Sequence, residues 1–89
     1  MQYEWDEEKN RINKAKHCIS FQPAVRIFDD PIFRVISTKV VDSEERWKSI
    51  GIVDGVMLVL VAHTWTNDDV IRVISARKAS RQEQRDYAR

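Results

Sequence analysis

The sequence contains few of the residues that build disulfides, metal sites or tight glycine turns. Its 89 residues include one cysteine, Cys18, two histidines, two glycines and two prolines. One cysteine excludes an internal disulfide, and the Cys and His residues lack the spacing of a metal motif. The longest apolar run, residues 56–62, is too short to span a bilayer, and the N-terminus does not resemble a secretion signal. We therefore expect a cytoplasmic protein without metal or other cofactor.

The order of local patterns predicts one α+β domain over residues 1–89. A short strand at 3–5 precedes a helix that begins after an Asp6 N-cap and ends near His17. Ser20 is a second candidate N-cap, for a helix that carries the apolar residues through Phe28. Ser80, with Glu83 three residues later, forms the capping box of a C-terminal helix. Between these helices the pattern changes to β, so we expect two N-terminal helices, a four-stranded antiparallel sheet and a C-terminal helix.

The expected strands are separated by recognisable turns. Their predicted ranges are 32–37, 46–53, 56–65 and 70–77, with residues 38–45 as a polar loop. Asp54-Gly55 is the strongest hairpin signal, and a two-residue loop there pairs Val53 with Val56. That register places Arg46 opposite His63, and a turn within 66–69 places His63 opposite Arg72. The sequence thus predicts a row of Arg46, His63 and Arg72 on one sheet face.

Such a row would be suited to phosphate chemistry. Arginine presents a fixed fork of donors to phosphate, and histidine can act as acid or base. Glu44 or Glu45 could supply a carboxylate between the cations. Each residue also has a structural alternative, because a strand-end histidine is commonly hydrogen-bonded and the arginines could pair with acidic loops. Strict alternation puts Arg77 on the face opposite Arg72, unless the strand twists or bulges.

Positive charge is concentrated near the C-terminus. Residues 72–89 carry six basic and two acidic side chains, net +4, whereas residues 1–71 carry nine basic and twelve acidic, net −3. A basic segment on a mildly acidic body indicates a nucleic acid or an acidic partner as ligand. The alternative is a solvated helix face.

The chain resembles the BrnT family of bacterial type II toxins over essentially its whole length. The residues that carry the resemblance are Trp5, Asp6, Lys9, Asn13, Lys16, His17, Phe21 and Ala24, then Glu45, Arg46, Gly51, His63 and Thr64, and finally residues 74–77, Ala79, Glu83 and Tyr87. Family members often have glycine where this chain has Cys18. Glycine suits a left-handed helix C-cap, so Cys18 either adopts that conformation with strain or the helix ends differently.

The resemblance implies a RelE-like ribonuclease fold and a cognate BrnA-type antitoxin. The antitoxin would neutralise the toxin, in a complex of two toxins and two antitoxins, and would supply all contact with operator DNA. The implied reaction is metal-independent RNA cleavage by attack of the 2′-OH on the adjacent phosphate, which inhibits translation and growth. Such chemistry needs a proton acceptor, cations for the developing charge and a donor for the leaving oxygen.

Within that resemblance, His63 is the leading acid or base candidate. Arg46, Arg72 and Arg77 would stabilise the phosphate, and Glu45 would orient an arginine or act as base. Secondary RNA-binding candidates are Lys16, His17, Arg81 and Tyr87, although Tyr87 could equally pack the C-terminal helix.

Two other functions fit the same sequence. The chain could act as a binding subunit with weak catalysis, which growth arrest on expression alone would exclude. It could instead bind DNA itself, but the helix around Lys16 lacks the features of a recognition helix.

Overall fold

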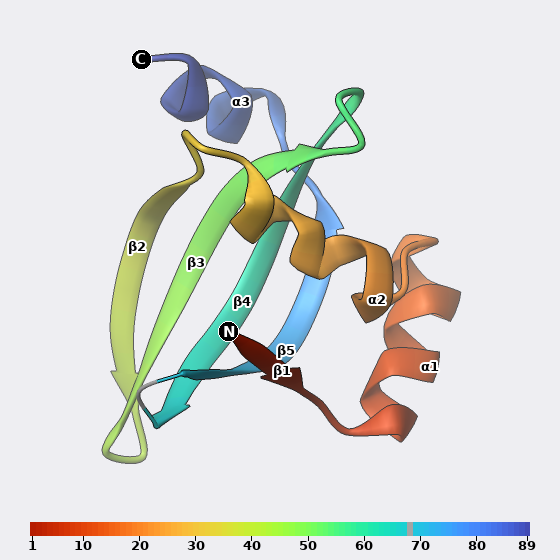
Figure 1. Ribbon diagram of the computed structural model, residues 1–89, viewed down its shortest axis with the longest axis vertical. Coiled ribbons are helices and arrows are strands. Elements are labelled where there is room, and N and C mark those ends of the chain that lie inside the picture. The colour runs from red at the N-terminus through yellow and green to blue at the C-terminus, as the bar shows by residue number, and fades with distance from the viewer. Residues whose placement is uncertain (68) are drawn as a thin grey trace.

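A mixed five-stranded sheet with the order β1-β5-β4-β3-β2 forms the centre of the structure (Figure 1). The computed structural model describes residues 1–67 and 69–89. The strands are β1 (Gln2–Glu4), β2 (Arg34–Val41), β3 (Glu44–Val53), β4 (Met57–Asn67) and β5 (Val70–Lys78). Strands β2 to β5 form the predicted antiparallel meander, and β1 pairs in parallel with β5.

The helices are α1 (Glu7–His17), α2 (Phe21–Ala24), the 3-10 helix η1 (Val25–Asp29) and α3 (Arg81–Ala88). Two predicted caps are confirmed. Asp6 Oδ1 accepts hydrogen bonds from the N–H groups of Glu8 at 2.8 Å and Lys9 at 3.2 Å, and Ser80 and Glu83 form the capping box of α3. Ser20 precedes α2 but makes no side-chain cap bond. None of the described helices has the length and hydrophobicity needed to cross a membrane.

Buried asparagines, rather than apolar contacts, hold α1 against the sheet. Asn13 Nδ2 donates to the carbonyl of Ala76 at 2.8 Å, and its Oδ1 accepts the N–H of Ala76 at 3.1 Å. Asn10 Oδ1 accepts the N–H of Phe21 at 2.8 Å. Asn13 thus completes the backbone hydrogen bonding of β5 as a neighbouring strand would, and it fixes α1 beside that strand.

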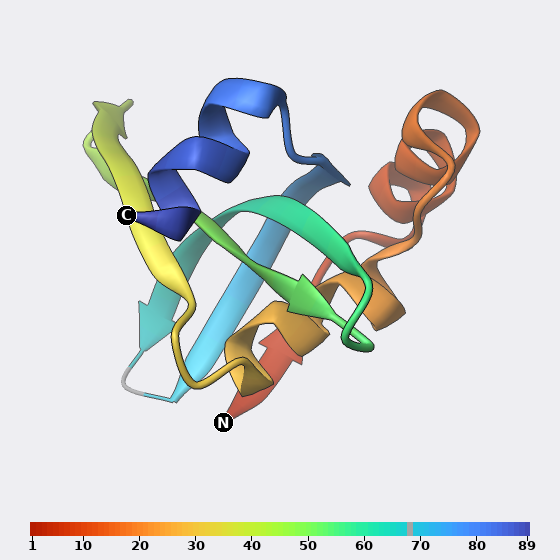
Figure 2. The same ribbon diagram turned by 90° about the horizontal axis from the view of Figure 1, so that it is seen from above.

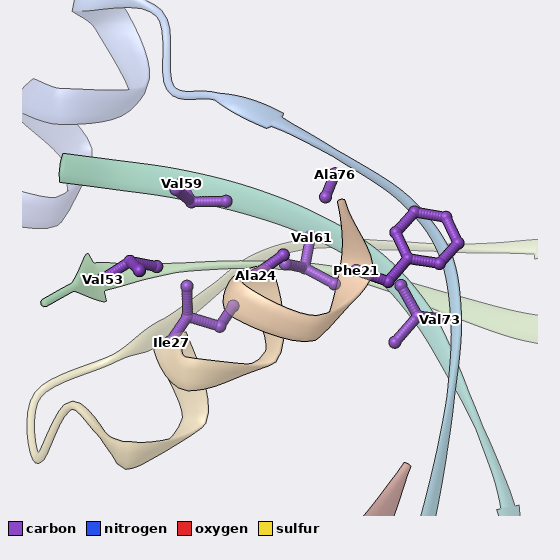
Figure 3. Close-up of a cluster of buried hydrophobic side chains, with 8 residues drawn as sticks. All are labelled: Phe21, Ala24, Ile27, Val53, Val59, Val61, Val73 and Ala76. Carbon is purple, nitrogen blue, oxygen red and sulfur yellow. The ribbon is translucent and has the colours of Figure 1, made fainter. Parts of the chain in front are cut away.

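The main core lies between the sheet and the α2–η1 segment. Its eight buried residues are Phe21, Ala24, Ile27, Val53, Val59, Val61, Val73 and Ala76 (Figure 3). Gly51 permits this packing, because a Cβ there would lie 2.8 Å from the carbonyl oxygen of Ile27. On the other face, α3 covers a smaller cluster of Ile50, Leu60 and Ala79. Figure 2 shows α3 and η1 on opposite sides of the sheet, with α1 at the β5 edge.

The predicted polar loop at 38–45 is wrong, because two strands continue through it. β2 runs to Val41, β3 begins at Glu44, and only Asp42 and Ser43 lie between them, with φ of 50° and 66°. Two successive positive φ values are typical of a type I′ hairpin turn, and short polar side chains tolerate this region better than most residues.

The predicted hairpin at Asp54-Gly55 is confirmed, but its loop is one residue longer than expected. Val53 pairs with Met57, so Val56 belongs to the loop, and every later pair of β3 and β4 shifts by one residue. His63 consequently pairs with Trp47. In β5 it pairs with Val73 rather than Arg72, because Asn67 pairs with Val70 and the β4–β5 register shifts between Trp65 and Asn67. The expected row of Arg46, His63 and Arg72 is therefore wrong. The turn expected at 66–69 includes Asp68, which lies outside the described residues.

Candidate functional site

The two faces of the sheet differ in what covers them. Because paired residues share a face, His63 lies with Val59, Val61 and Val73 on the face covered by α2 and η1, which we call the covered face. The opposite face carries Ile50 and Leu60 beneath α3. Beyond α3 it carries mostly polar side chains, which we call the open face: Ser37, Lys39, Arg46, Lys48, Ala62, Thr64, Arg72 and Ser75.

A groove crosses the open face from β2 toward α1. One depression of about 380 Å³ is lined by residues of β2 to β5, among them Lys39, Arg46 and Lys48. A second, of about 200 Å³, lies between α1 and β5, where Lys16 and His17 contribute to its wall. Ile74 lines both depressions, so they adjoin. Together they form a basic channel across the sheet, which we call the groove.

Arginines on the open face are held by exposed ion pairs. Arg46 Nε lies 3.3 Å from Glu44 Oε1, and Arg72 Nη1 lies 3.0 Å from Glu4 Oε2. Lys39 is the cross-strand neighbour of Arg46, and Lys48 is exposed on the same face. Exposed ion pairs contribute little to stability, about 0–1 kcal/mol, so a phosphate can compete for these arginines at small cost. Their donors match the geometry of a phosphodiester.

A bulge in β5 changes the expected relation of Arg72 to Arg77. Ala62 pairs with Ser75 while His63 pairs with Val73, which leaves Ile74 as an extra residue. Arg72 and Arg77 therefore lie on the same face, so the expectation from strict alternation is wrong. The sequence allowed for this outcome if the strand bulged, and the bulge at Ile74 is present.

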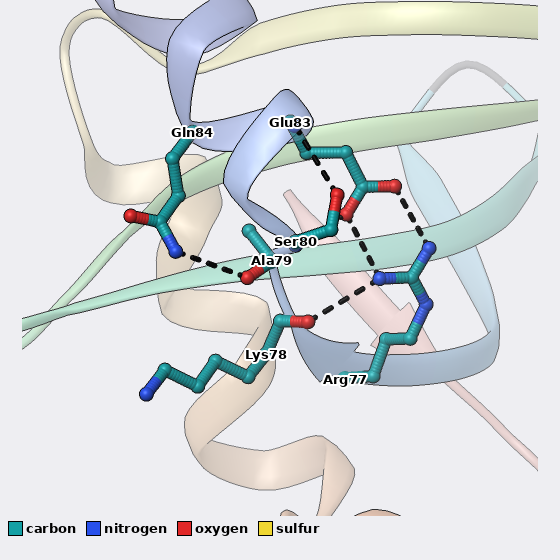
Figure 4. A network of polar contacts seen from close by, with 6 residues as sticks. All are labelled: Arg77, Lys78, Ala79, Ser80, Glu83 and Gln84. Carbon is teal, nitrogen blue, oxygen red and sulfur yellow. Dashed lines mark hydrogen bonds and ion pairs between the residues drawn. The ribbon is translucent and has the colours of Figure 1, made fainter.

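Arg77 is nevertheless engaged by the C-terminal helix. Its Nη1 and Nη2 each donate to a carboxylate oxygen of Glu83 at 2.8 Å, and Nη1 also donates to the carbonyl of Lys78 (Figure 4). The hydrogen bonds from Arg77 are the main reason that the pKa of Glu83 falls to about 2. The same hydrogen bonds raise the pKa of Arg77. The pair joins the end of β5 to the first turn of α3.

His63 is a buried residue of the covered face. It is 1% exposed, with ring centroids 5.1 Å from Phe28, 6.0 Å from Trp65 and 6.1 Å from Trp47. Its Nε2 is 2.8 Å from the hydroxyl of Ser49, and Nδ1 has no hydrogen-bond partner in the described part of the chain. Burial lowers the pKa of His63 to about 4, so the imidazole is neutral at pH 7. The structure separates it from the arginines that the sequence placed beside it.

Three further candidates lie outside the groove. Glu45 pairs with Val40 near the β2–β3 turn and so lies on the face opposite Arg46, which Glu44 contacts instead. Tyr87 packs against the Ile50 cluster, and its hydroxyl donates to Asp30 Oδ2 at 2.6 Å. That hydrogen bond is the main reason that the pKa of Tyr87 rises to about 12. Arg81 is exposed at the start of α3.

The position of Lys16 and His17 depends on Cys18. Helix α1 ends at His17, and Cys18 adopts the left-handed conformation with φ of 62° while its N–H donates to the carbonyl of Lys14 at 2.9 Å. Of the two expected alternatives, Cys18 therefore adopts the left-handed conformation, and the helix does not end in a different way. Both basic residues remain in the last helical turn beside the groove.

Sequence reasoning missed Lys39 and Lys48. The period-two spacing of Arg46 and Lys48 was a usable signal, because it puts both side chains on one face of β3. Lys39 was hidden by the incorrect loop at 38–45. Within residues 1–67 and 69–89, no group of three or more His, Cys, Asp or Glu side chains is arranged to hold a metal ion.

Comparisons with known proteins show the family to which the chain belongs. Residues 5–83 match the model of a family described as the ribonuclease toxin BrnT of a type II toxin–antitoxin system. The chain is also similar to the crystal structure of the Brucella abortus ribonuclease toxin BrnT, with 32% identity and a TM-score of 0.73. That match covers 91% of this chain and 99% of the Brucella chain. A search of curated proteins gave no significant match.

Proposed function

Because the chain belongs to the BrnT family of ribonuclease toxins of type II toxin–antitoxin systems, we propose that it cleaves RNA within the groove of the open face. The reaction needs no metal ion, and cleavage inhibits translation and stops growth. The observation that supports this most is the groove itself, which presents Lys39, Arg46 and Lys48 on a sheet face that α3 leaves uncovered.

The groove is suited to single-stranded RNA in two respects. Its cations extend from β2 to the last turn of α1, so they can hold the reacting phosphate together with neighbouring phosphates of the same strand. Its floor is the small side chain of Ala62 and the side chain of Ile74, over which a nucleotide can lie flat. Electrostatic attraction of this kind is largely independent of base sequence.

In the proposed reaction the RNA 2′-oxygen attacks the adjacent phosphorus while its proton passes to a base. The P–O5′ bond breaks, the 5′-oxygen takes a proton, and the products end in a 2′,3′-cyclic phosphate and a 5′-hydroxyl. Arg46, Lys48 and Arg72 stabilise the charge that develops on the phosphorane oxygens. His17, on the α1 wall of the groove, exchanges the protons, because an imidazole can both accept and donate one. Lys16 beside it binds the backbone.

The other predicted residues receive different roles in this proposal. His63 supports the sheet from the covered face, where its neutral ring packs among aromatic side chains. Arg77 anchors α3 through Glu83. Glu44, rather than Glu45, orients Arg46 when no RNA is bound.

The proposed partner is a BrnA-type antitoxin. It neutralises the toxin in a complex with two copies of each chain and supplies the contact with operator DNA. Family membership supports a cognate antitoxin, and the basic groove supports an acidic segment as the part that inhibits.

Cleavage of naked RNA in the presence of EDTA tests the proposal. We expect wild-type protein to cleave and Arg46→Ala to lose about a hundredfold or more in rate, since an arginine that stabilises transferring phosphate contributes several kcal/mol to the transition state. Arg26→Ala is the matched control, because Arg26 forms a similar exposed ion pair with Asp54 at 3.0 Å but lies outside the groove. No cleavage by wild type with or without EDTA, together with normal growth on expression, would instead indicate a binding subunit.

A further inference from the structure

The two edges of the sheet are protected to different extents. At the β5 edge, β1 pairs with residues 70–72 and Asn13 bonds both backbone groups of Ala76. The other edge is β2, whose outer side pairs with no strand in the described ranges. An unprotected edge strand can accept a strand from another chain.

The geometry of β2 shows which backbone groups point outward. The strand is interrupted by a bulge at Ile36, and residues 37–41 then pair regularly with β3. Val41 and Glu44 flank a two-residue turn, so they form a hydrogen-bonded pair, and bonded and non-bonded pairs alternate from there. Thr38 and Val40 therefore direct their N–H and C=O groups away from the sheet, toward solvent.

The side chains of this edge differ sharply between the two faces. On the covered face, Val40 is 69% exposed beside its cross-strand partner Glu45. Two strands away, in β4, Trp65 is 39% exposed and in edge contact with Trp47. On the open face the same segment carries Lys39, beside Arg46 in the groove. At this edge Val40 is thus an exposed apolar position on one face, and Lys39 beside Arg46 is a cationic position on the other.

We propose that the cognate antitoxin neutralises this toxin by adding a strand to residues 37–41 of β2. The added segment alternates apolar and acidic side chains, because alternate residues of a strand point to opposite faces. Its apolar residues pack on Val40, and its acidic residues reach Lys39 and Arg46. This inference rests on the proposed function in requiring a cognate antitoxin and a groove that binds RNA.

Strand addition at this edge explains inhibition by direct competition. The carboxylates of the added strand enter the groove at its β2 end and occupy the cations that would hold the RNA phosphates. Charge complementarity also selects the partner, since an alternating apolar and basic strand would be repelled on the open face.

Amide hydrogen exchange of the toxin, with and without the purified cognate antitoxin, tests the proposal directly. We expect the amides of Thr38 and Val40 to exchange about tenfold or more slowly in the complex, because each gains a backbone partner. Amides of α3 such as Gln82 serve as the comparison and keep their free-toxin rates. Protection confined to α3 or to α1 would overturn the proposal. Protection of Thr38 and Val40 in the toxin alone would also overturn it, by showing that a second toxin copy occupies the edge.

Substitutions at Val40 provide the second test. Val40→Pro removes an outward N–H, and Val40→Glu places a charge on the apolar side; we expect each to weaken antitoxin binding about tenfold or more. Val56→Glu is the matched control, since Val56 is 87% exposed in the β3–β4 loop, away from β2. All three variants should cleave RNA as wild type does.

The outcomes separate this inference from the proposed function. Unchanged antitoxin affinity in both Val40 variants, with intact thermal unfolding, would overturn strand addition even if the toxin cleaves RNA. A toxin that fails to cleave RNA would overturn the proposed function, while the affinity measurements would still show whether β2 is the docking edge.

Discussion

At the scale of single residues, Cys18 occupies a helix C-cap that requires a left-handed backbone, although its side chain disfavours that conformation. Its φ is 62°, and a left-handed conformation costs an ordinary residue about 1–2 kcal/mol. Replacing Cys18 with glycine would remove this cost. Part of the resulting gain in stability is lost again, because glycine has more conformational freedom in the unfolded chain.

We therefore expect Cys18→Gly to raise the free energy of unfolding by about 1 kcal/mol, measured by urea denaturation. Cys18→Ala is the control, because it removes the thiol but retains the Cβ, and its stability should stay close to wild type. Equal stability of the glycine and alanine variants would show that the helix end is not strained.

His63 makes stability depend on pH. In the folded protein burial lowers its pKa to about 4, whereas an unfolded histidine has a pKa near 6.5. Between these values the unfolded chain binds a proton that the folded chain does not. The contribution of His63 to the free energy of unfolding is therefore fully present above pH 6.5. It falls by roughly 3 kcal/mol in total as the pH decreases toward 4.

Chemical denaturation at pH 7 and pH 5 measures this effect. We expect the wild type to lose stability between the two pH values and His63→Gln to lose much less. A wild-type protein that is equally stable at both values would contradict the buried, neutral state of His63.

At the scale of elements, α3 is attached mainly by polar contacts. None of its residues is fully buried. Arg34 Nη1 donates to the carbonyls of Asp86 at 2.8 Å and Arg89 at 2.7 Å, and Arg77 holds Glu83. Asp30 accepts from the Tyr87 hydroxyl and from the N–H groups of Ile32 and Ile52. Burial alone would raise the pKa of Asp30, but these three hydrogen bonds outweigh it and lower the pKa.

Removing the Tyr87 hydroxyl should loosen this helix without unfolding the sheet. We expect Tyr87→Phe to speed amide exchange in α3 about fivefold or more, because a hydrogen bond to a carboxylate contributes about 1.5–3 kcal/mol. Exchange in β4 should remain unchanged and serves as the internal control. Equal acceleration in β4 would mean that α3 and the sheet open together.

The elements also show how far sequence reasoning extends. Caps and hairpin positions were predictable, because Asp6, Ser80 and Asp54-Gly55 act through local backbone geometry. Register was not predictable, because it depends on one extra residue in the β3–β4 loop, on a shift between Trp65 and Asn67, and on the bulge at Ile74. A shift of one residue moves a side chain to the other face of a sheet, which is why the predicted row failed.

At the scale of the whole molecule, net charge conceals a separation of chemistry between the two sheet faces. The chain carries only +1 overall, yet cations line the groove while the covered face holds the core and the aromatic side chains around His63. The basic C-terminal segment was visible in the sequence. The contribution of Lys39 and Lys48 became visible only with the strand pairing, because they come from a part of the chain with net negative charge.

In the proposed mechanism RNA is cleaved on the open face, and His63 acts only through the fold. The most direct measurement is the single-turnover cleavage rate of naked RNA by Lys48→Gln and His63→Gln, each normalised to folded protein. We predict that Lys48→Gln is slowed about tenfold or more, whereas His63→Gln stays within about threefold of wild type. A folded His63→Gln variant without cleavage, beside a fully active Lys48→Gln variant, would contradict these roles for Lys48 and His63.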